Sequence, residues 1–237
     1  MKKKKLILLI VGAVLLLAVI GTLLYIFLSV LPAERERRER EEAIRAYYQA
    51  KLEQYRSENE RYADYEVDVA FLGDSLTDGY DVAKYYPQYV VSNRGIGGET
   101  TFGLEARLQV SVYDLKPKVA VLLIGANNMD TMMENYEDII LGMKENLPET
   151  EIVVLSLTSM SGEWGRKNRL AISNNVFLKM IAKRNGCSFV DLYSPLLNPE
   201  TGEIYAEYTT DGGHLTARGY EVVTAAITPT LQQLLGK

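Results

Sequence analysis

The hydrophobic and polar positions of this chain fall into three successive patterns, of which the first is the simplest. Residues 6–31, "LILLIVGAVLLLAVIGTLLYIFLSVL", carry no charge and follow four lysines at positions 2–5. As an α-helix this run is about 39 Å long, whereas the hydrocarbon core of a bilayer is about 30 Å thick. The pattern therefore predicts a membrane-spanning helix with some tilt, and we assign residues 1–32 to an N-terminal transmembrane anchor.

The flanks of the apolar run bear on cleavage and orientation. The run is longer than the apolar region of a signal peptide, which is usually about 7–15 residues, and no small-x-small cleavage site follows it. We therefore expect an uncleaved, single-pass signal anchor in the cell membrane. Lysines precede the run and arginines follow it, but the very short lysine-bearing tail favours an N-terminus on the inside. The rest of the chain is then extracytoplasmic.

The second pattern, residues 33–65, predicts a charged helical spacer. The segment has no glycine, and its only apolar stripe is narrow, recurring at steps of four, four, three and seven. The stripe consists of Ile44, Tyr48, Leu52, Tyr55 and Tyr62. Two interpretations stay open: the stripe packs on the chain's own domain, or residues 44–62 form a short coil that makes a homodimer.

The third pattern, residues 66–237, alternates short apolar runs with amphipathic stretches. The expected strands are residues 67–72, 89–92, 119–124, 152–157 and 188–191. The expected helices are residues 100–115, 132–147, 168–185 and 216–235. Such alternation predicts an α/β domain with a five-stranded parallel sheet covered on both faces, whose ligands bind beyond the carboxyl ends of the strands.

Composition narrows the class of protein. Hydrophobic residues make up 47% of the chain and charged residues 24%, which is typical of a folded protein. The net charge of −5 and the absence of a basic stripe in the globular part argue against a nucleic-acid partner. One cysteine and one histidine exclude an intrachain disulfide and a multi-cysteine metal site. We expect no metal and no cofactor.

Two of the loops that follow the expected strands contain polar groups suited to acyl transfer. In "FLGDSLTDGY" (71–80), Gly73 permits a sharp turn that lifts Ser75 to the edge of the sheet, where it is either a nucleophile or part of a helix cap. In "LLIGANNMD" (122–130), Asn127 offers two neutral donors for an oxyanion, or simply forms a turn.

Two further loops complete the set. "NRGIGGETT" (93–101) brings glycines to the start of a helix, without the Gly-Lys-Ser/Thr of a phosphate-binding loop. In "TTDGGHL" (209–215), Asp211 lies three residues before His214, so a tight turn lets the carboxylate bind Nδ1 and leaves Nε2 free to accept a proton. A solvated loop histidine is the alternative. Together the four loops supply a nucleophile, oxyanion donors, an orienting acid and a base.

These motifs resemble those of the SGNH, or GDSL, hydrolases, and most of all the platelet-activating-factor acetylhydrolase-like branch. Gly73-Asp74-Ser75-Leu76 is similar to the nucleophile block, Gly98 to the glycine block, and Gly125-Ala126-Asn127 to the asparagine block. Asp211-Gly212-Gly213-His214 is similar to the Asp-x-x-His block. The order of blocks covers residues 66 to 237, and Asn128 stands where many members carry Asp.

The resemblance implies a flavodoxin-like three-layer α/β/α fold and a serine esterase. Ser75, Asp211 and His214 are then the catalytic triad, and Ser75, Gly98 and Asn127 form the oxyanion hole. Trp164, the only tryptophan, follows the fourth strand and either binds substrate or seals its loop on the core. The expected substrates are short-chain or acetyl esters of a carbohydrate or lipid. An O-acyltransferase with the same triad and a non-catalytic, membrane-anchored binding module are the alternatives.

Overall fold

The computed structural model describes residues 2–236, which divide into two compact units between Ala50 and Lys51. The first unit contains α1 (Lys2–Tyr25), a short π-helix (Ile26–Val30) and the first part of α2 (Leu31–Asn59). No side chain of α1 is buried. Among the described residues this N-terminal helical region is the one segment long and apolar enough to cross a membrane, with a mean hydropathy of 3.0 over its best window.

The second unit is built on a five-stranded parallel sheet. Its strands are β1 (Val69–Gly73), β2 (Val91–Gly95), β3 (Val119–Leu123), β4 (Glu151–Leu155) and β5 (Ser188–Val190). The order β2-β1-β3-β4-β5 is that of a flavodoxin-like sheet, with the switch in direction between β1 and β3. Gly73 at the end of β1 pairs with Gly95 of β2 and Leu123 of β3. The loops after these three strands therefore leave the same edge of the sheet.

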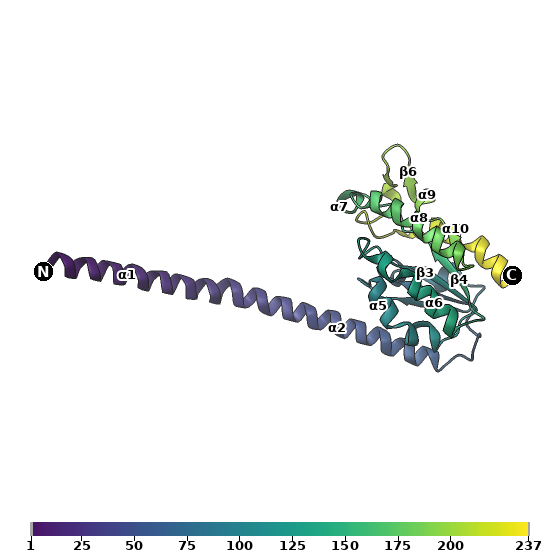
Figure 1. Ribbon diagram of the computed structural model, residues 1–237, viewed down its shortest axis with the longest axis horizontal. Helices are drawn as coiled ribbons and strands as arrows, with labels where there is room; N and C mark the ends of the chain where they lie inside the picture. Colours follow the sequence, from purple (N-terminus) through teal and green to yellow (C-terminus); the bar gives the residue numbers. More distant parts are fainter. Residues whose placement is uncertain (1, 237) are drawn as a thin grey trace. The chain divides into compact units, whose positions relative to one another are not determined.

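Helices cover both faces of the sheet, as Figure 1 shows. One face packs on α5 (Thr101–Ala106), α6 (Tyr136–Asn146) and α8 (Asn168–Arg184), and its core includes Ala70, Leu72, Leu122 and Val154. The other face packs on α4 (Val82–Tyr85), α9 (Tyr193–Leu196) and α10 (Ala217–Leu235), and its core includes Phe71, Val121, Val153 and Leu155. Alternate residues of each strand thus enter opposite cores, which confirms the predicted three-layer α/β/α fold.

Several expected elements differ in detail from the observed ones. The helix expected at residues 100–115 is interrupted at Arg107, after which Gln109–Tyr113 forms a π-helix. The stretch 132–147 divides into a 3₁₀ turn, Met132–Glu134, and α6. Besides α4 and α9, five further short elements lie in segments where periodicity is too brief to detect them. These are α3 (Ser75–Asp78), α7 (Gly162–Gly165), the hairpin of β6 (Leu197–Asn198) and β7 (Glu203–Ile204), and a 3₁₀ turn at Ala206–Tyr208.

The last turns of α2 are part of the second unit. Leu52 and Tyr55 are buried, and the Tyr55 hydroxyl donates to the Gly95 carbonyl at 2.6 Å. Tyr62, beyond the end of the helix, packs partly buried against the core of the first face. At these positions the apolar stripe therefore packs on its own domain. Ile44, at 61% exposure, is the one exposed residue of the stripe. The boundaries at 32/33 and 65/66 and the homodimer through residues 44–62 stay predictions.

Candidate active site

Ser75 lies at the start of α3, directly beyond β1. Asp74 caps this helix by accepting a hydrogen bond from the Leu76 amide at 3.0 Å, so Ser75 is its first residue. The preceding Gly73 is required for close packing and not for its backbone angles: a Cβ atom there would lie 2.1 Å from the Leu123 carbonyl oxygen. A side chain at position 73 would push β1 away from β3 and displace the serine.

His214 and Asp211 lie in the loop before α10. A bridge between Thr209 and Leu215 closes this loop. Asp211 Oδ1 accepts from the amides of Gly213 at 2.9 Å and His214 at 2.8 Å, and Oδ2 lies 2.7 Å from Nδ1 of His214. These hydrogen bonds to the His214 amide and ring and to the Gly213 amide lower the pKa of Asp211 to about 2, so the carboxylate is ionised at neutral pH.

The two loops bring serine, histidine and aspartate into one hydrogen-bonded chain. Nε2 of His214 lies 3.0 Å from the Ser75 hydroxyl, and Nδ1 contacts Asp211 on the opposite side of the ring. Both distances are within the range that proton transfer requires, about 2.6–3.2 Å. Nearly half of each side chain of the Asp211–His214 pair is exposed. The histidine that the sequence singled out is thus held between the other two residues.

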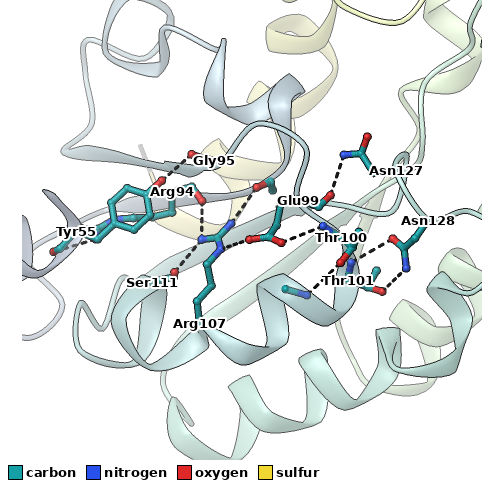
Figure 2. A network of polar contacts seen from close by, with 12 residues as sticks. Tyr55, Arg94, Gly95, Glu99, Thr100, Thr101, Arg107, Ser111, Asn127 and Asn128 are labelled. Carbon is teal, nitrogen blue, oxygen red and sulfur yellow. Dashed lines mark hydrogen bonds and ion pairs between the residues drawn. The ribbon is translucent and has the colours of Figure 1, made fainter. Parts of the chain in front are cut away.

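Gly98 and Asn127 line the same cavity as Ser75 and His214. Gly98 has a φ of +78°, a backbone conformation that residues with a Cβ rarely adopt. The side chain of Asn127 comes from the loop after β3, and its Nδ2 donates to the Glu99 carbonyl at 2.8 Å. An amide nitrogen has two hydrogens, so one of them remains for a group in the cavity. This bond also ties the loops after β2 and β3 together (Figure 2).

A buried arginine, Arg107, fixes the loop that contains Gly98 by binding Glu99 in the same loop. Figure 2 shows its guanidinium at the centre of a polar network, in which it contacts Glu99, Ser111 and carbonyl groups of β1 and β2. Nε donates to Glu99 Oε2 at 3.0 Å, and Nη2 donates to the Gly73 carbonyl at 3.0 Å. Sequence patterns did not reveal Glu99 and Arg107, because two charged residues eight positions apart carry no periodicity that marks them as buried partners.

Asn128, which departs from the common Asp of the resembling family, has a defined role in this structure. Its Oδ1 accepts from the Thr101 amide at 3.2 Å, and its Nδ2 donates to the Thr101 hydroxyl at 2.9 Å (Figure 2). Both bonds fix the first turn of α5 to the loop after β3. An amide suits this position because it offers a donor and an acceptor at once.

The cavity beside Ser75 is small and mostly apolar. Its volume is about 230 Å³, and its lining includes Leu76, Ala126, Met160 and Trp164. Trp164 comes from α7 and contacts the cavity directly, and Lys167 Nζ lies 4.8 Å above its ring. Pockets for drug-sized ligands measure about 300–1,000 Å³. The space next to the serine therefore fits a short acyl chain.

Two other groups bear on the chemistry of the site. Asp74 is buried beside Ser75, and desolvation raises its pKa to about 6, which is unusual for a carboxyl group. Burial also raises the pKa of the Cys187 thiol, which does not favour a thiolate nucleophile. Within residues 2–236, no group of three or more His, Cys, Asp or Glu side chains is arranged to hold a metal ion.

The fold and this cavity define an α/β enzyme that acts on carboxylic esters. The chain belongs to the GDSL-like lipase/acylhydrolase family, whose model matches residues 71–222. It is accordingly a carboxylic ester hydrolase of the GDSL type, as the motifs predicted. No curated protein matches the chain.

Solved structures from several bacteria share this fold. A GDSL-like lipase from Bacteroides thetaiotaomicron is 25% identical with a TM-score of 0.68, covering 77% of this chain and 97% of that chain. A Streptococcus pneumoniae protein, provisionally named a platelet activating factor, is 24% identical with a TM-score of 0.75, covering 84% of this chain and 99% of that chain. An acetylxylan esterase from Geobacillus stearothermophilus is 20% identical with a TM-score of 0.59, covering 71% and 95%.

Proposed function

We propose that this protein is a membrane-anchored serine esterase that removes short acyl groups from a carbohydrate or lipid through a Ser75–His214–Asp211 triad. The observation that carries the proposal is the hydrogen-bonded chain from the Ser75 hydroxyl through His214 to the Asp211 carboxylate. Ionised Asp211 holds the proton of the imidazole on Nδ1 and leaves Nε2 as the base.

The reaction then proceeds in two steps. Ser75 Oγ attacks the ester carbonyl carbon while Nε2 of His214 takes its proton, and the amides of Ser75 and Gly98 with Asn127 Nδ2 stabilise the oxyanion. When the C–O bond to the alcohol breaks, His214 returns the proton to the leaving oxygen and an acyl-serine remains. Water, deprotonated by His214, attacks the acyl-serine, which releases the acid and regenerates Ser75.

Exposure of the histidine supports water as the acyl acceptor. His214 and Asp211 are about half exposed, so water reaches the imidazole without displacing any part of the chain. An acyltransferase needs to keep water from the acyl-enzyme until its acceptor binds. The open imidazole therefore favours hydrolysis over transfer to another alcohol.

The size of the cavity supports a short acyl group. About 230 Å³ beside Ser75 holds an acetyl or similarly small group and leaves little room for a fatty acyl chain. The acetylxylan esterase with the same fold acts on acetyl groups carried by a sugar polymer. Trp164 at the cavity wall offers a flat apolar surface against which a sugar ring packs.

The N-terminal helix supports a single-pass anchor. The four lysines that precede it favour a cytoplasmic N-terminus and an extracytoplasmic catalytic domain. The substrate would then belong to the cell envelope, as a lipid of the bilayer or a polysaccharide next to it.

The proposal is tested by ester hydrolysis with the full chain in nonionic detergent. The measurement compares 4-nitrophenyl acetate, butyrate and octanoate for the native protein, Ser75→Ala and Ser57→Ala, the last changing an exposed serine of α2. We expect kcat/KM to fall with acyl length. We also expect Ser75→Ala to lower kcat by about 10⁴-fold or more, because the nucleophile is lost, with Ser57→Ala unaffected.

Two results would contradict the proposal. Hydrolysis by Ser75→Ala at the native rate would exclude this serine as the nucleophile. A preference for octanoate would exclude a short-chain esterase and indicate that the cavity opens for longer chains. Mass spectrometry of the native protein quenched during turnover gives an independent check, since an acetyl-enzyme carries its added mass on the peptide that contains Ser75.

A further inference from the structure

A second cavity adjoins the one beside Ser75 and differs from it in size and in charge. Its volume is about 590 Å³, and Asn127 lines both cavities. Three cations line the second cavity: Arg166, Lys167 and Arg169. We propose that this cavity is the binding site for an anionic group, a phosphate or a carboxylate, on the alcohol part of the ester. This inference rests on the proposed esterase function and names its substrate class.

The position of Asn127 connects the two cavities to one substrate. In the proposed reaction Asn127 binds the oxyanion, so the reacting carbonyl group lies where the cavities meet. The smaller cavity is mostly apolar and beside the nucleophile, which suits the acyl chain. The alcohol part then extends into the larger cavity, whose cations are within reach of a group several bonds away from the ester oxygen.

The charges around the second cavity favour an anion. Asp130 is the one carboxylate in its lining, against three cations. The guanidinium groups of Arg166 and Arg169 have no ion-pair or hydrogen-bond partner among residues 2–236, and both residues are exposed. The ammonium of Lys167 lies over the ring of Trp164, which lines the acyl cavity. This contact holds Lys167 in place. The two free guanidinium groups can each bind phosphate or carboxylate oxygens in pairs.

The sequence of α8 adds to this asymmetry of charge. The helix "NRLAISNNVFLKMIAKR" contains no aspartate or glutamate, and Arg169 and Ser173 of its first turns line the cavity. A solvated helix surface of a protein with a net charge of −5 would be expected to carry both signs. Lys183 and Arg184 lie in the last turn of the helix, where basic side chains suit the helix dipole. The charge that bears on the cavity is therefore that of the three lining cations, with no carboxylate of α8 to offset it.

The experiment compares matched esters that differ by one charged group. Acetyl-glycerol 3-phosphate is paired with monoacetylglycerol, and acetylated methyl glucuronoside, with its free carboxylate, is paired with the acetylated methyl glucoside. Release of acetate by the full chain in nonionic detergent gives kcat/KM for each. We expect at least one anionic member to exceed its neutral partner about tenfold, and the pair with the larger ratio identifies phosphate or carboxylate as the preferred group.

Charge-reversal variants then assign the preference to this cavity. In Arg166→Glu/Arg169→Glu, the ratio of kcat/KM between the anionic and the neutral ester should fall to about one or below. Lys183→Glu changes an exposed cation near the other end of the same helix and should leave the ratio as in the native protein. The native preference should also weaken from about 0.02 M to about 0.5 M salt, because screening increases.

Binding to the Ser75→Ala protein separates this inference from the proposed reaction. Calorimetric titration with acetyl-glycerol 3-phosphate and with the acetylated glucuronoside should show binding that the double charge reversal removes. Binding of this kind without turnover of any ester would support the anionic subsite and contradict the esterase mechanism. Turnover with equal rates for charged and neutral esters, or a preference that survives the double reversal, would overturn the subsite and leave the esterase intact.

Discussion

At the scale of single residues, Asp74 makes stability depend on pH. Desolvation raises the pKa of its buried carboxyl from 3.8 to about 6, so the folded protein holds this proton more tightly than the unfolded chain. The associated stability is complete below about pH 4 and is lost as the pH rises through about 6. At neutral pH the protein therefore folds with an unfavourably buried charge beside Ser75.

Replacing this carboxyl by an amide should remove the cost. Asp74→Asn keeps an oxygen to accept from the Leu76 amide, so the cap of α3 is retained. We expect its free energy of unfolding in urea to exceed that of the native protein by about 1–3 kcal/mol at pH 8 and to match it at pH 4. Asp81→Asn, at the exposed cap of α4, is the control and should show no gain that depends on pH. An equal difference at both pH values would refute the assignment.

The residues that we propose to be catalytic were singled out from sequence because each stands next to a recognisable local pattern. Ser75 follows a buried strand and a glycine, and His214 follows Asp211 by one tight turn. Glu99 and Arg107 could not be identified, because nothing in the sequence distinguishes a buried ion pair from two exposed charges. The steric reason for glycine at position 73 could not be predicted either, because the contact with Leu123 depends on how two strands pack in space.

At the scale of elements, the end of α2 neutralises a buried charge in the sheet. Arg94 of β2 is fully buried, and desolvation lowers its pKa. Its Nη2 lies 3.2 Å from Glu58 Oε2, Nη1 donates to the Tyr55 carbonyl at 3.2 Å, and the guanidinium stacks over the Tyr55 ring at 4.8 Å. The contact also ties α2 to the strand whose loop holds Gly98.

A truncation series tests how much the domain depends on this contact. A fragment of residues 51–237 keeps Tyr55 and Glu58, whereas a fragment of residues 61–237 loses both, so Arg94 loses its carboxylate and the ring that it stacks on. Removing one partner of a buried ion pair lowers the free energy of unfolding by about 3–5 kcal/mol. In domains of this size each kcal/mol lowers Tm by about 2–4 °C, so we expect the shorter fragment to have a Tm lower by about 10 °C or more. Circular dichroism melts of both fragments measure this. Equal melting temperatures would show that α2 is dispensable.

The elements of this unit were predictable to different degrees. The strands β1, β3 and β4 were found because each contains a continuous apolar run. The strand β2 is mostly polar, and it begins and ends later than predicted, at Val91 and Gly95. The long amphipathic helices α8 and α10 were found by their periodicity. The break at Arg107 was not, because a side chain that turns inward to bond Gly73 and Glu99 is a tertiary effect on a segment whose own pattern is helical.

At the scale of the whole molecule, the apolar N-terminal helix is the feature from which we predict where the enzyme works. The first unit carries the uncharged run of residues 6–31, and no side chain of α1 is buried, which is favourable only in a lipid or detergent environment. We therefore expect the full chain to remain in the membrane fraction after alkaline carbonate extraction, and a fragment of residues 51–237 to appear in the supernatant. Recovery of the full chain in the supernatant would contradict an uncleaved anchor.

The orientation of that anchor is tested by labelling single cysteines on intact cells. With Cys187→Ser as background, Ser57→Cys places a thiol on the exposed side of α2, and Lys3→Cys places one at the N-terminal end of α1. If the lysines hold the N-terminus inside, a membrane-impermeant maleimide should modify position 57 in intact cells and position 3 only after lysis. Labelling in the reverse order would place the catalytic domain in the cytoplasm, where a polysaccharide of the cell envelope could not be its substrate.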